Sequence, residues 1–180
     1  MLAHDGNFKD SILRKYDAPF ADIHRVDLQQ ALKQRAEELG VKIVLGSRVS
    51  SIDLDRQRPI VHTQNRNYTA DLVVAADGLW SKCRESFLGR ADEPLPTGDL
   101  AYRIVLTLDQ IKDPKLQEWV SKPACHFWIG PKAHVVAYSV RGGTMYNIVL
   151  LVPDDLPTEI SRQKGSTEEM RKLFNGWDPV

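Results

Sequence analysis

Cysteine is scarce in this chain, and the sequence has neither long apolar runs nor an excess of charge of one sign. Its two cysteines, Cys83 and Cys125, are too few for a disulfide framework and lack metal-ligand spacing, so we expect a reducing compartment and no metal site. No apolar run approaches the ~20 residues that a membrane-spanning helix needs. Basic and acidic residues number 24 each, a balance that favours neither nucleic acid nor an anionic membrane as a partner.

The amino terminus also lacks the pattern of a secretory signal. MLAHDGNFKD places polar and charged residues where a signal peptide has its apolar core. Hydrophobic residues make up 42% of the chain and charged residues 27%, which is ordinary for a folded globular protein. We therefore predict a cytoplasmic or peripherally located protein without a transmembrane segment. Its 180 residues allow one domain, or one domain and part of another.

The most informative segment that is present spans residues 71–84, DLVVAADGLWSKCR. Residues 72–76 are apolar without alternation, which is typical of a strand buried on both faces. The strand would end at Asp77-Gly78, and open α/β sheets bind nucleotides at the ends of their parallel strands. Gly78 permits a turn or a close approach of a ligand, and Ser81 is a candidate N-cap for the helix that follows. An ordinary strand–turn–helix with an Asp-Gly turn explains the same residues equally well.

This segment resembles the aspartate-glycine motif of the single-component FAD-dependent aromatic hydroxylases, the family of salicylate hydroxylase and para-hydroxybenzoate hydroxylase. The family pattern of an apolar strand, Asp-Gly, two residues, Ser, two residues and Arg is filled here by Asp77, Gly78, Ser81 and Arg84. The resemblance implies that the aspartate lies near the flavin pyrophosphate and is tied to the use of reduced nicotinamide. For Arg84, pairing with an acid, holding the turn, and a plain surface position all remain open.

A second similarity begins at His24-Arg25-Val26-Asp27-Leu28, which opens a predicted helix that runs to residue 39. The family has a similar His-Arg-x-Asp-Leu segment, whose arginine hydrogen-bonds the flavin. The planar, permanently charged guanidinium of Arg25 suits that role. A cation is unfavourable beside a helix N-terminus, so Arg25 should point at an acceptor elsewhere unless it is merely solvated. The resemblance also implies a backbone contact of Val49 with the adenine end of FAD, although a buried strand valine is the simpler interpretation.

The remaining pattern predicts an α/β (α+β mixed) fold. We expect residues 1–98 to form an incomplete Rossmann-like FAD-binding domain, and residues 99–180 to form part of a substrate-binding domain with an antiparallel sheet that lies over the flavin ring in the family. The predicted elements are a helix at 25–39, strands at 41–45, 48–54, 58–63 and 72–76, a helix at 80–88, a connector at 91–99, a strand at 102–108, a helix at 114–120, strands at 124–129, 133–140 and 144–152, and a helix at 167–174.

Two elements of the family pattern are missing from the sequence. The Gly-x-Gly-x-x-Gly turn that would hold the FAD pyrophosphate does not occur, and neither does the later Gly-Asp motif. The resemblance therefore implies a fragment or a truncated product. Without its neighbours the motif strand would expose Leu72, Val73 and an unpaired edge. Such an edge favours poor solubility or a homo-oligomer.

The resemblance implies hydroxylation of a small aromatic substrate such as a phenol, with FAD as cofactor, NAD(P)H as co-substrate and oxygen as the second substrate. The cofactor carries the redox chemistry, so no side chain is assigned a catalytic role, although His126 and His134 are candidates for bases. The predicted substrate-binding residues are Tyr102, Arg103, His126, Trp128 and Tyr138. Arg103 suits a carboxylate. His126 and Trp128 share one strand face and Phe127 and Ile129 the other, so only one pair can face a pocket; core packing is the simpler interpretation of these aromatics.

Two other functions remain open. The first is a non-catalytic remnant or interaction module that binds no flavin by itself, which the missing phosphate turn favours. The second is a flavin-dependent epoxidase or reductase of the same superfamily. The stretches GDLAYRIVLTL and FWIGPKAHVVAY resemble the aromatic hydroxylases more closely, and they favour hydroxylation over that second alternative.

Overall fold

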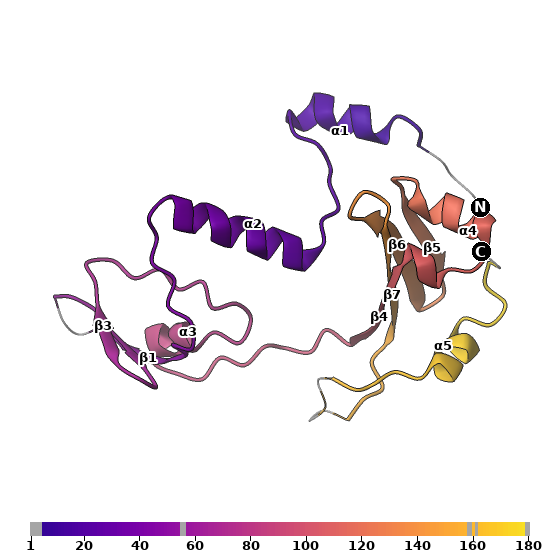
Figure 1. Cartoon of the computed structure of the whole chain (residues 1–180). Coiled ribbons are helices and arrows are strands. Elements are labelled where there is room, and N and C mark those ends of the chain that lie inside the picture. Colours follow the sequence, from indigo (N-terminus) through magenta and orange to yellow (C-terminus); the bar gives the residue numbers. More distant parts are fainter. Residues whose placement is uncertain (1–4, 55–56, 158–159, 161, 179–180) are drawn as a thin grey trace. The chain divides into compact units, whose positions relative to one another are not determined.

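The computed structural model describes residues 5–54, 57–157, 160 and 162–178. The chain divides into two compact units, one of residues 1–33 and 98–180 and the other of residues 34–97 (Figure 1). Helix α2 (Arg25–Glu38) begins in the first unit and ends in the second. These units are defined by contacts, and the functional division into residues 1–98 and 99–180 stays a prediction.

The second unit contains a small antiparallel sheet and one helix. The strands β1 (Val49–Asp53), β2 (Ile60–Thr63) and β3 (Asn67–Thr69) pair in the order β1-β2-β3. Helix α3 (Lys82–Leu88) packs on β1, and the backbone N–H of Ile52 donates to the hydroxyl of Ser86 at 3.2 Å. The strands predicted at 48–54 and 58–63 are confirmed, as is the helix predicted at 80–88, which begins at Lys82 after the N-cap Ser81, while β3 was not predicted.

Two predicted strands are wrong. Residues 41–45 and 72–76 do not form strands, and Leu72 and Val74 are each 77% exposed. A strand persists only where a neighbour satisfies its backbone N–H and C=O groups, and the described residues supply no such neighbour to either segment. The apolar sequence of residues 72–76 therefore gives an exposed chain segment here, and the unpaired strand edge expected there is not formed.

The sheet of the first unit has four antiparallel strands. In the order β4-β7-β6-β5 they are β4 (Asp99–Thr107), β7 (Met145–Pro153), β6 (Ala133–Val140) and β5 (Cys125–Gly130). The same unit contains α1 (Phe8–Tyr16), the 3₁₀ turn Leu108–Gln110, α4 (Pro114–Ser121) and α5 (Thr167–Leu173). The elements predicted from residue 102 onward are confirmed, because the turns Gly130-Pro131 and Arg141-Gly142-Gly143 separate the strands clearly in the sequence. Helix α1 was not predicted.

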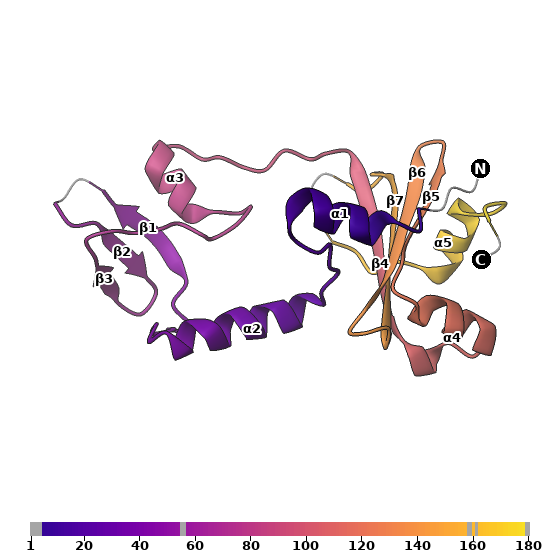
Figure 2. The same cartoon turned by 90° about the horizontal axis from the view of Figure 1, so that it is seen from above.

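The register of this sheet defines its two faces, since directly paired residues point to the same side. We call one the helix-covered face. It comprises Tyr102, Leu106, His126, Trp128, Ala137, Tyr146 and Ile148, and α4 and α5 lie on its side of the sheet (Figure 2). We call the other the open face. It comprises Arg103, Val105, Phe127, Ile129, Val136, Tyr138, Asn147 and Val149.

The core of the first unit forms on the helix-covered face. Val120 of α4 and Tyr146 of β7 are only 3% and 4% exposed, and Trp119 packs against the same cluster. The open face instead leaves Phe127 63% and Ile129 85% exposed at its β5 edge, whereas Val149 on β7 is only 8% exposed. Across the described residues, none of the helices has both the length and the apolar character needed to cross a membrane.

Candidate functional site

The carboxylate of Asp77 is anchored to the start of helix α3. Its Oδ1 accepts from the Ser81 hydroxyl at 2.5 Å, and its Oδ2 accepts from the backbone N–H of Cys83 at 3.1 Å. Ser81 is the N-cap of the helix, and its Oγ accepts from the backbone N–H of Arg84 at 3.0 Å. The hydroxyl of Ser81, followed by the Cys83 amide, holds the pKa of Asp77 well below its usual range. Asp77 is therefore an ionised anchor of the turn.

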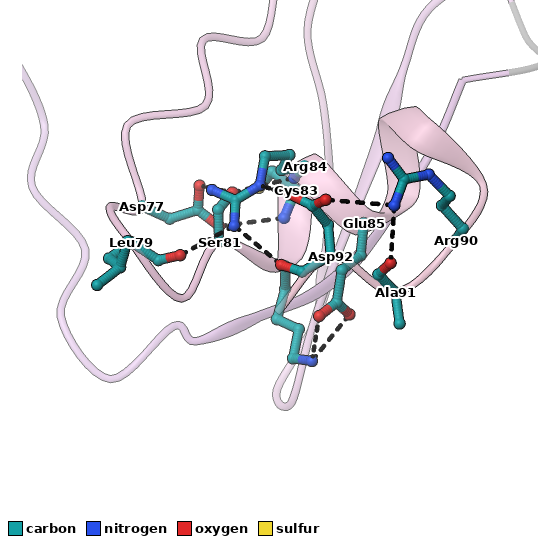
Figure 3. A network of polar contacts seen from close by, with 10 residues as sticks. Asp77, Leu79, Ser81, Cys83, Arg84, Glu85, Arg90, Ala91 and Asp92 are labelled. Carbon is teal, nitrogen blue, oxygen red and sulfur yellow. Dashed lines mark hydrogen bonds and ion pairs between the residues drawn. The ribbon is translucent and has the colours of Figure 1, made fainter. Parts of the chain in front are cut away.

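The guanidinium of Arg84 also holds this turn (Figure 3). Its Nε donates to Asp92 Oδ2 at 2.7 Å, and its Nη2 donates to the carbonyl oxygens of Leu79 and Asp92, each at 3.0 Å. A planar guanidinium that reaches three acceptors fixes them relative to one another. Two of the interpretations left open for Arg84, pairing with an acid and holding the Asp-Gly turn, are both observed, and the plain surface position is excluded.

The turn leaves open space at its glycine. Gly78 has φ +77°, a value that non-glycine residues rarely adopt, and a Cβ added there would meet nothing within 4 Å. A hollow of about 390 Å³ adjoins the turn and is lined mainly by apolar side chains, those of Ile52, Leu54, Val73, Ala75 and Phe87, together with Asp77, Gly78, Ser81, Cys83 and Arg84. An exposed glycine backbone beside apolar walls fits a cofactor with both a phosphate chain and flat rings.

Arg25, the first residue of α2, is exposed. Within the described part of the chain its guanidinium has no hydrogen bond or ion pair, so its donors are available to a ligand. Its neighbour His24 has a buried Nδ1 that lies 3.9 Å from Asp27 Oδ2 and has no hydrogen-bond partner among the described residues. Val49 starts β1 opposite Thr63, beside an irregularity in the ladder. The cofactor contacts of Arg25 and Val49 stay predictions.

The five predicted substrate-binding residues do not share one face of the sheet. Tyr102, His126 and Trp128 belong to the helix-covered face. The ring of His126 stacks on Trp119 with a centroid separation of 4.0 Å, and its Nδ1 is 3.0 Å from the hydroxyl oxygen of Tyr146. Burial lowers the pKa of His126. These contacts give His126 and Trp128 a packing role, which is the simpler of the two interpretations of the sequence.

Tyr102 also contacts neighbouring residues on the helix-covered face. Burial, followed by a hydrogen bond with Glu169, raises the pKa of its phenol. A Cβ at Gly165 would lie within 3 Å of the Tyr102 ring, so the segment that leads into α5 packs closely against this tyrosine. Its substrate role therefore stays a prediction without support from its surroundings.

Arg103 and Tyr138 are the two predicted residues on the open face. The register places Arg103 in a row with Val149, Val136 and Phe127 across the four strands. Tyr138 lies directly opposite Asn147 on β7. Sequence reasoning missed Asn147, Val149 and Val136 as members of this surface. Their parity with Arg103 would have identified them, but only after the strand register was known.

Comparison with known proteins defines the family. The family model for FAD-dependent oxidoreductases matches residues 16–175, and the chain belongs to this family. It is 48% identical over 184 residues to the FAD-dependent monooxygenase OpS4 of Beauveria bassiana, which covers 100% of this chain and 43% of that protein. It is 33% identical over 172 residues to the 3-hydroxybenzoate 6-hydroxylase of Polaromonas naphthalenivorans, covering 94% of this chain and 41% of that enzyme. The chain thus spans less than half the length of these relatives.

A solved structure agrees with this assignment. The substrate complex of a salicylate hydroxylase superposes with a TM-score of 0.64 at 26% identity, over 84% of this chain and 40% of that one. FAD is the cofactor of the family, which confirms the cofactor predicted from the two sequence motifs. The mixed α/β fold predicted from the sequence is confirmed as well.

The ionisation of Asp77 gives a test of the turn that needs no cofactor. Its pKa is lowered on folding, so its stabilising contribution is fully present above the unfolded value of about 4 and is lost as the pH falls through the folded pKa. We expect an NMR titration to show the Asp77 carboxylate still ionised at pH 3. In the Ser81→Ala variant the pKa should rise towards the ordinary value of 3.8. Equal titration curves in both proteins would contradict the anchoring.

Proposed function

We propose that this chain is part of an FAD-dependent, NAD(P)H-using monooxygenase that hydroxylates a phenolic or other aromatic substrate. The observation that carries this proposal is the Asp77-Gly78 turn. Ser81, Cys83 and Arg84 hold it rigidly, while the backbone at Gly78 is left open. Preorganised turns of this kind allow a cofactor to bind without first ordering the protein.

Different residues of the chain would contact different parts of the cofactor. Arg25 would donate hydrogen bonds to the flavin, and the backbone of Val49 would contact the adenine end. Asp77, Ser81 and Arg84 would keep the turn in shape, so that Gly78 lies against the phosphates. FAD, when bound, supplies the redox chemistry, and the protein supplies binding and orientation.

The open face is the proposed substrate side. Arg103 would bind a carboxylate through two parallel hydrogen bonds, and Val136, which lies in the same cross-strand row, would support an aromatic ring. The hydroxyl of Tyr138 and the amide of Asn147 would orient a phenol. A hydroxybenzoate fits this combination, and the names of the relatives, salicylate hydroxylase and 3-hydroxybenzoate 6-hydroxylase, support the same substrate class.

The test uses the complete protein that contains this chain. We expect it to purify with bound flavin and to oxidise NAD(P)H faster when salicylate or 3-hydroxybenzoate is added. Arg25→Ala should weaken FAD binding about tenfold, equivalent to ~1.4 kcal/mol, because it removes a charged donor. The control is Arg14→Ala, an exposed arginine on α1. Unchanged flavin affinity in Arg25→Ala would remove Arg25 from the cofactor site.

Two observations favour a second candidate for the chain by itself. Leu72 and Val74 are exposed in a segment without a strand partner, and the sequence has no glycine-rich phosphate turn. A non-catalytic module that binds no flavin alone would show both features. Purified chain that is colourless and does not quench flavin fluorescence would support this candidate. Gel filtration of the same sample tests the predicted homo-oligomer, which a clean monomer would contradict.

A further inference from the structure

Helix α2 is joined to the β6–β7 hairpin by one bidentate ion pair. Arg141 Nε donates to Asp27 Oδ2 at 2.6 Å, and Arg141 Nη2 donates to Asp27 Oδ1 at 2.5 Å. The two residues are 114 positions apart in the sequence and belong to the same compact unit. Two parallel hydrogen bonds between a guanidinium and a carboxylate fix the direction of approach as well as the distance.

The hairpin end of this link is itself rigid. Arg141 has φ +52°, a left-handed conformation that is uncommon outside glycine, and such conformations persist where the surroundings enforce them. Gly143 packs so closely on α4 that an added Cβ would collide with the backbone carbonyl of Ser121. The hydroxyl of Ser139 donates to the carbonyl of Lys122 at 3.2 Å. Asp27 is therefore bound to the β6–β7 turn, which itself packs on α4.

Helix geometry transfers this restraint to Arg25. Successive helical residues are rotated by about 100°, so Arg25 and Asp27 project roughly 200° apart around the axis. Asp27 faces the hairpin, and Arg25 consequently points away from it, exposed and with no partner among the described residues. An ion pair at Asp27 restrains rotation of the helix start about its axis, and it thereby restricts the direction in which the side chain of Arg25 leaves the helix.

We propose that Asp27 and Arg141 are positioning residues that hold Arg25 for cofactor binding and couple the start of α2 to the β6–β7 hairpin. This inference rests on the proposed function. An ion pair whose side chains are 37% and 42% exposed contributes little to overall stability. The role of this pair is therefore orientation, and its loss should weaken cofactor binding while leaving thermal stability nearly unchanged.

The first test measures FAD affinity and melting temperature in the complete protein. Asp27→Asn and Arg141→Gln should each weaken FAD binding about tenfold with little change in melting temperature. The double variant should be no weaker than either single variant, and the exchanged pair D27R/R141D should regain part of the affinity. Lys122→Gln, which removes an exposed ion pair with Glu118 on α4, is the matched control and should leave affinity unchanged. Additive effects of the two single variants would overturn the inference.

The second test needs no cofactor and uses amide hydrogen exchange. The N–H of Leu28 donates to the His24 carbonyl at 3.1 Å, and the N–H of Gly143 donates to the Val140 carbonyl at 3.2 Å. Asp27→Asn should accelerate exchange at both sites, although only one is on the mutated helix. Acceleration at Leu28 alone would overturn the coupling. A complete protein that binds no FAD would overturn the proposed function instead, together with the cofactor side of this inference.

Discussion

Replacing Asp77 with alanine is expected to weaken FAD binding of the complete protein about 100-fold, equivalent to ~2.7 kcal/mol. The carboxylate accepts from Ser81 and from the Cys83 amide, so its removal frees both donors and releases the turn that presents Gly78. The loss of a capping interaction should also destabilise the start of α3 by about 1 kcal/mol. Fluorescence titration with FAD measures the first effect, and urea denaturation followed by circular dichroism measures the second.

Two variants separate the anchoring role of Asp77 from a simple change of charge. Asp77→Asn keeps one carbonyl acceptor and should lose less affinity than the alanine variant. Glu93→Ala removes an exposed carboxylate that follows Asp92 in the sequence, and this variant should bind FAD normally. If Asp77→Ala and Glu93→Ala gave the same affinity, the turn would not be part of the cofactor site.

Replacing Gly143 with alanine is expected to reduce the free energy of unfolding by about 3 kcal/mol, the range of strained or overpacked sites. Its φ of +83° is unfavourable for a residue with a Cβ, and that Cβ would collide with the backbone carbonyl of Ser121, which cannot move aside as a flexible side chain would. Urea denaturation followed by tryptophan fluorescence measures the change, because Trp119 of α4 and Trp128 of β5 pack against the core.

Gly142→Ala is the matched control for this prediction. Gly142 is the preceding residue of the same turn and has φ +64°, but a Cβ there would meet nothing within 4 Å. Only the backbone strain remains, which costs roughly 1–2 kcal/mol. Equal destabilisation by both substitutions would show that the contact with Ser121 does not hold the hairpin against α4.

Local interactions were largely predictable from the sequence. Ser81 was identified as the N-cap of α3 because a cap depends on residues three positions away, and the structure contains that hydrogen bond. The pairing of Arg84 with an acid was one of the open interpretations, although Asp92 was not named as its partner. The turns of the β5–β6–β7 meander were visible as glycine and proline. In each of these cases the determining contacts lie within about ten residues.

The strand predicted at residues 72–76 shows where sequence reasoning fails. Its apolar composition indicated burial on both faces, but burial depends on neighbours that the described chain does not provide, and Leu72 is 77% exposed. Apolar composition favours a buried strand. The strand forms only where another segment of the protein pairs with its backbone N–H and C=O groups.

The sequence by itself determined the family, the flavin cofactor and the residues of the Asp77-Gly78 turn, because these follow from residue identity at fixed spacing. Only the tertiary structure decided which side of the sheet is open, placing Arg103 and Tyr138 on one face and His126 and Trp128 on the other. It alone joined Asp27 to Arg141. The physical reason is the same in both cases. Strand alternation shows from the sequence which residues of a strand share a face, but the face that the helices cover and a contact between residues 114 positions apart depend on the folded chain.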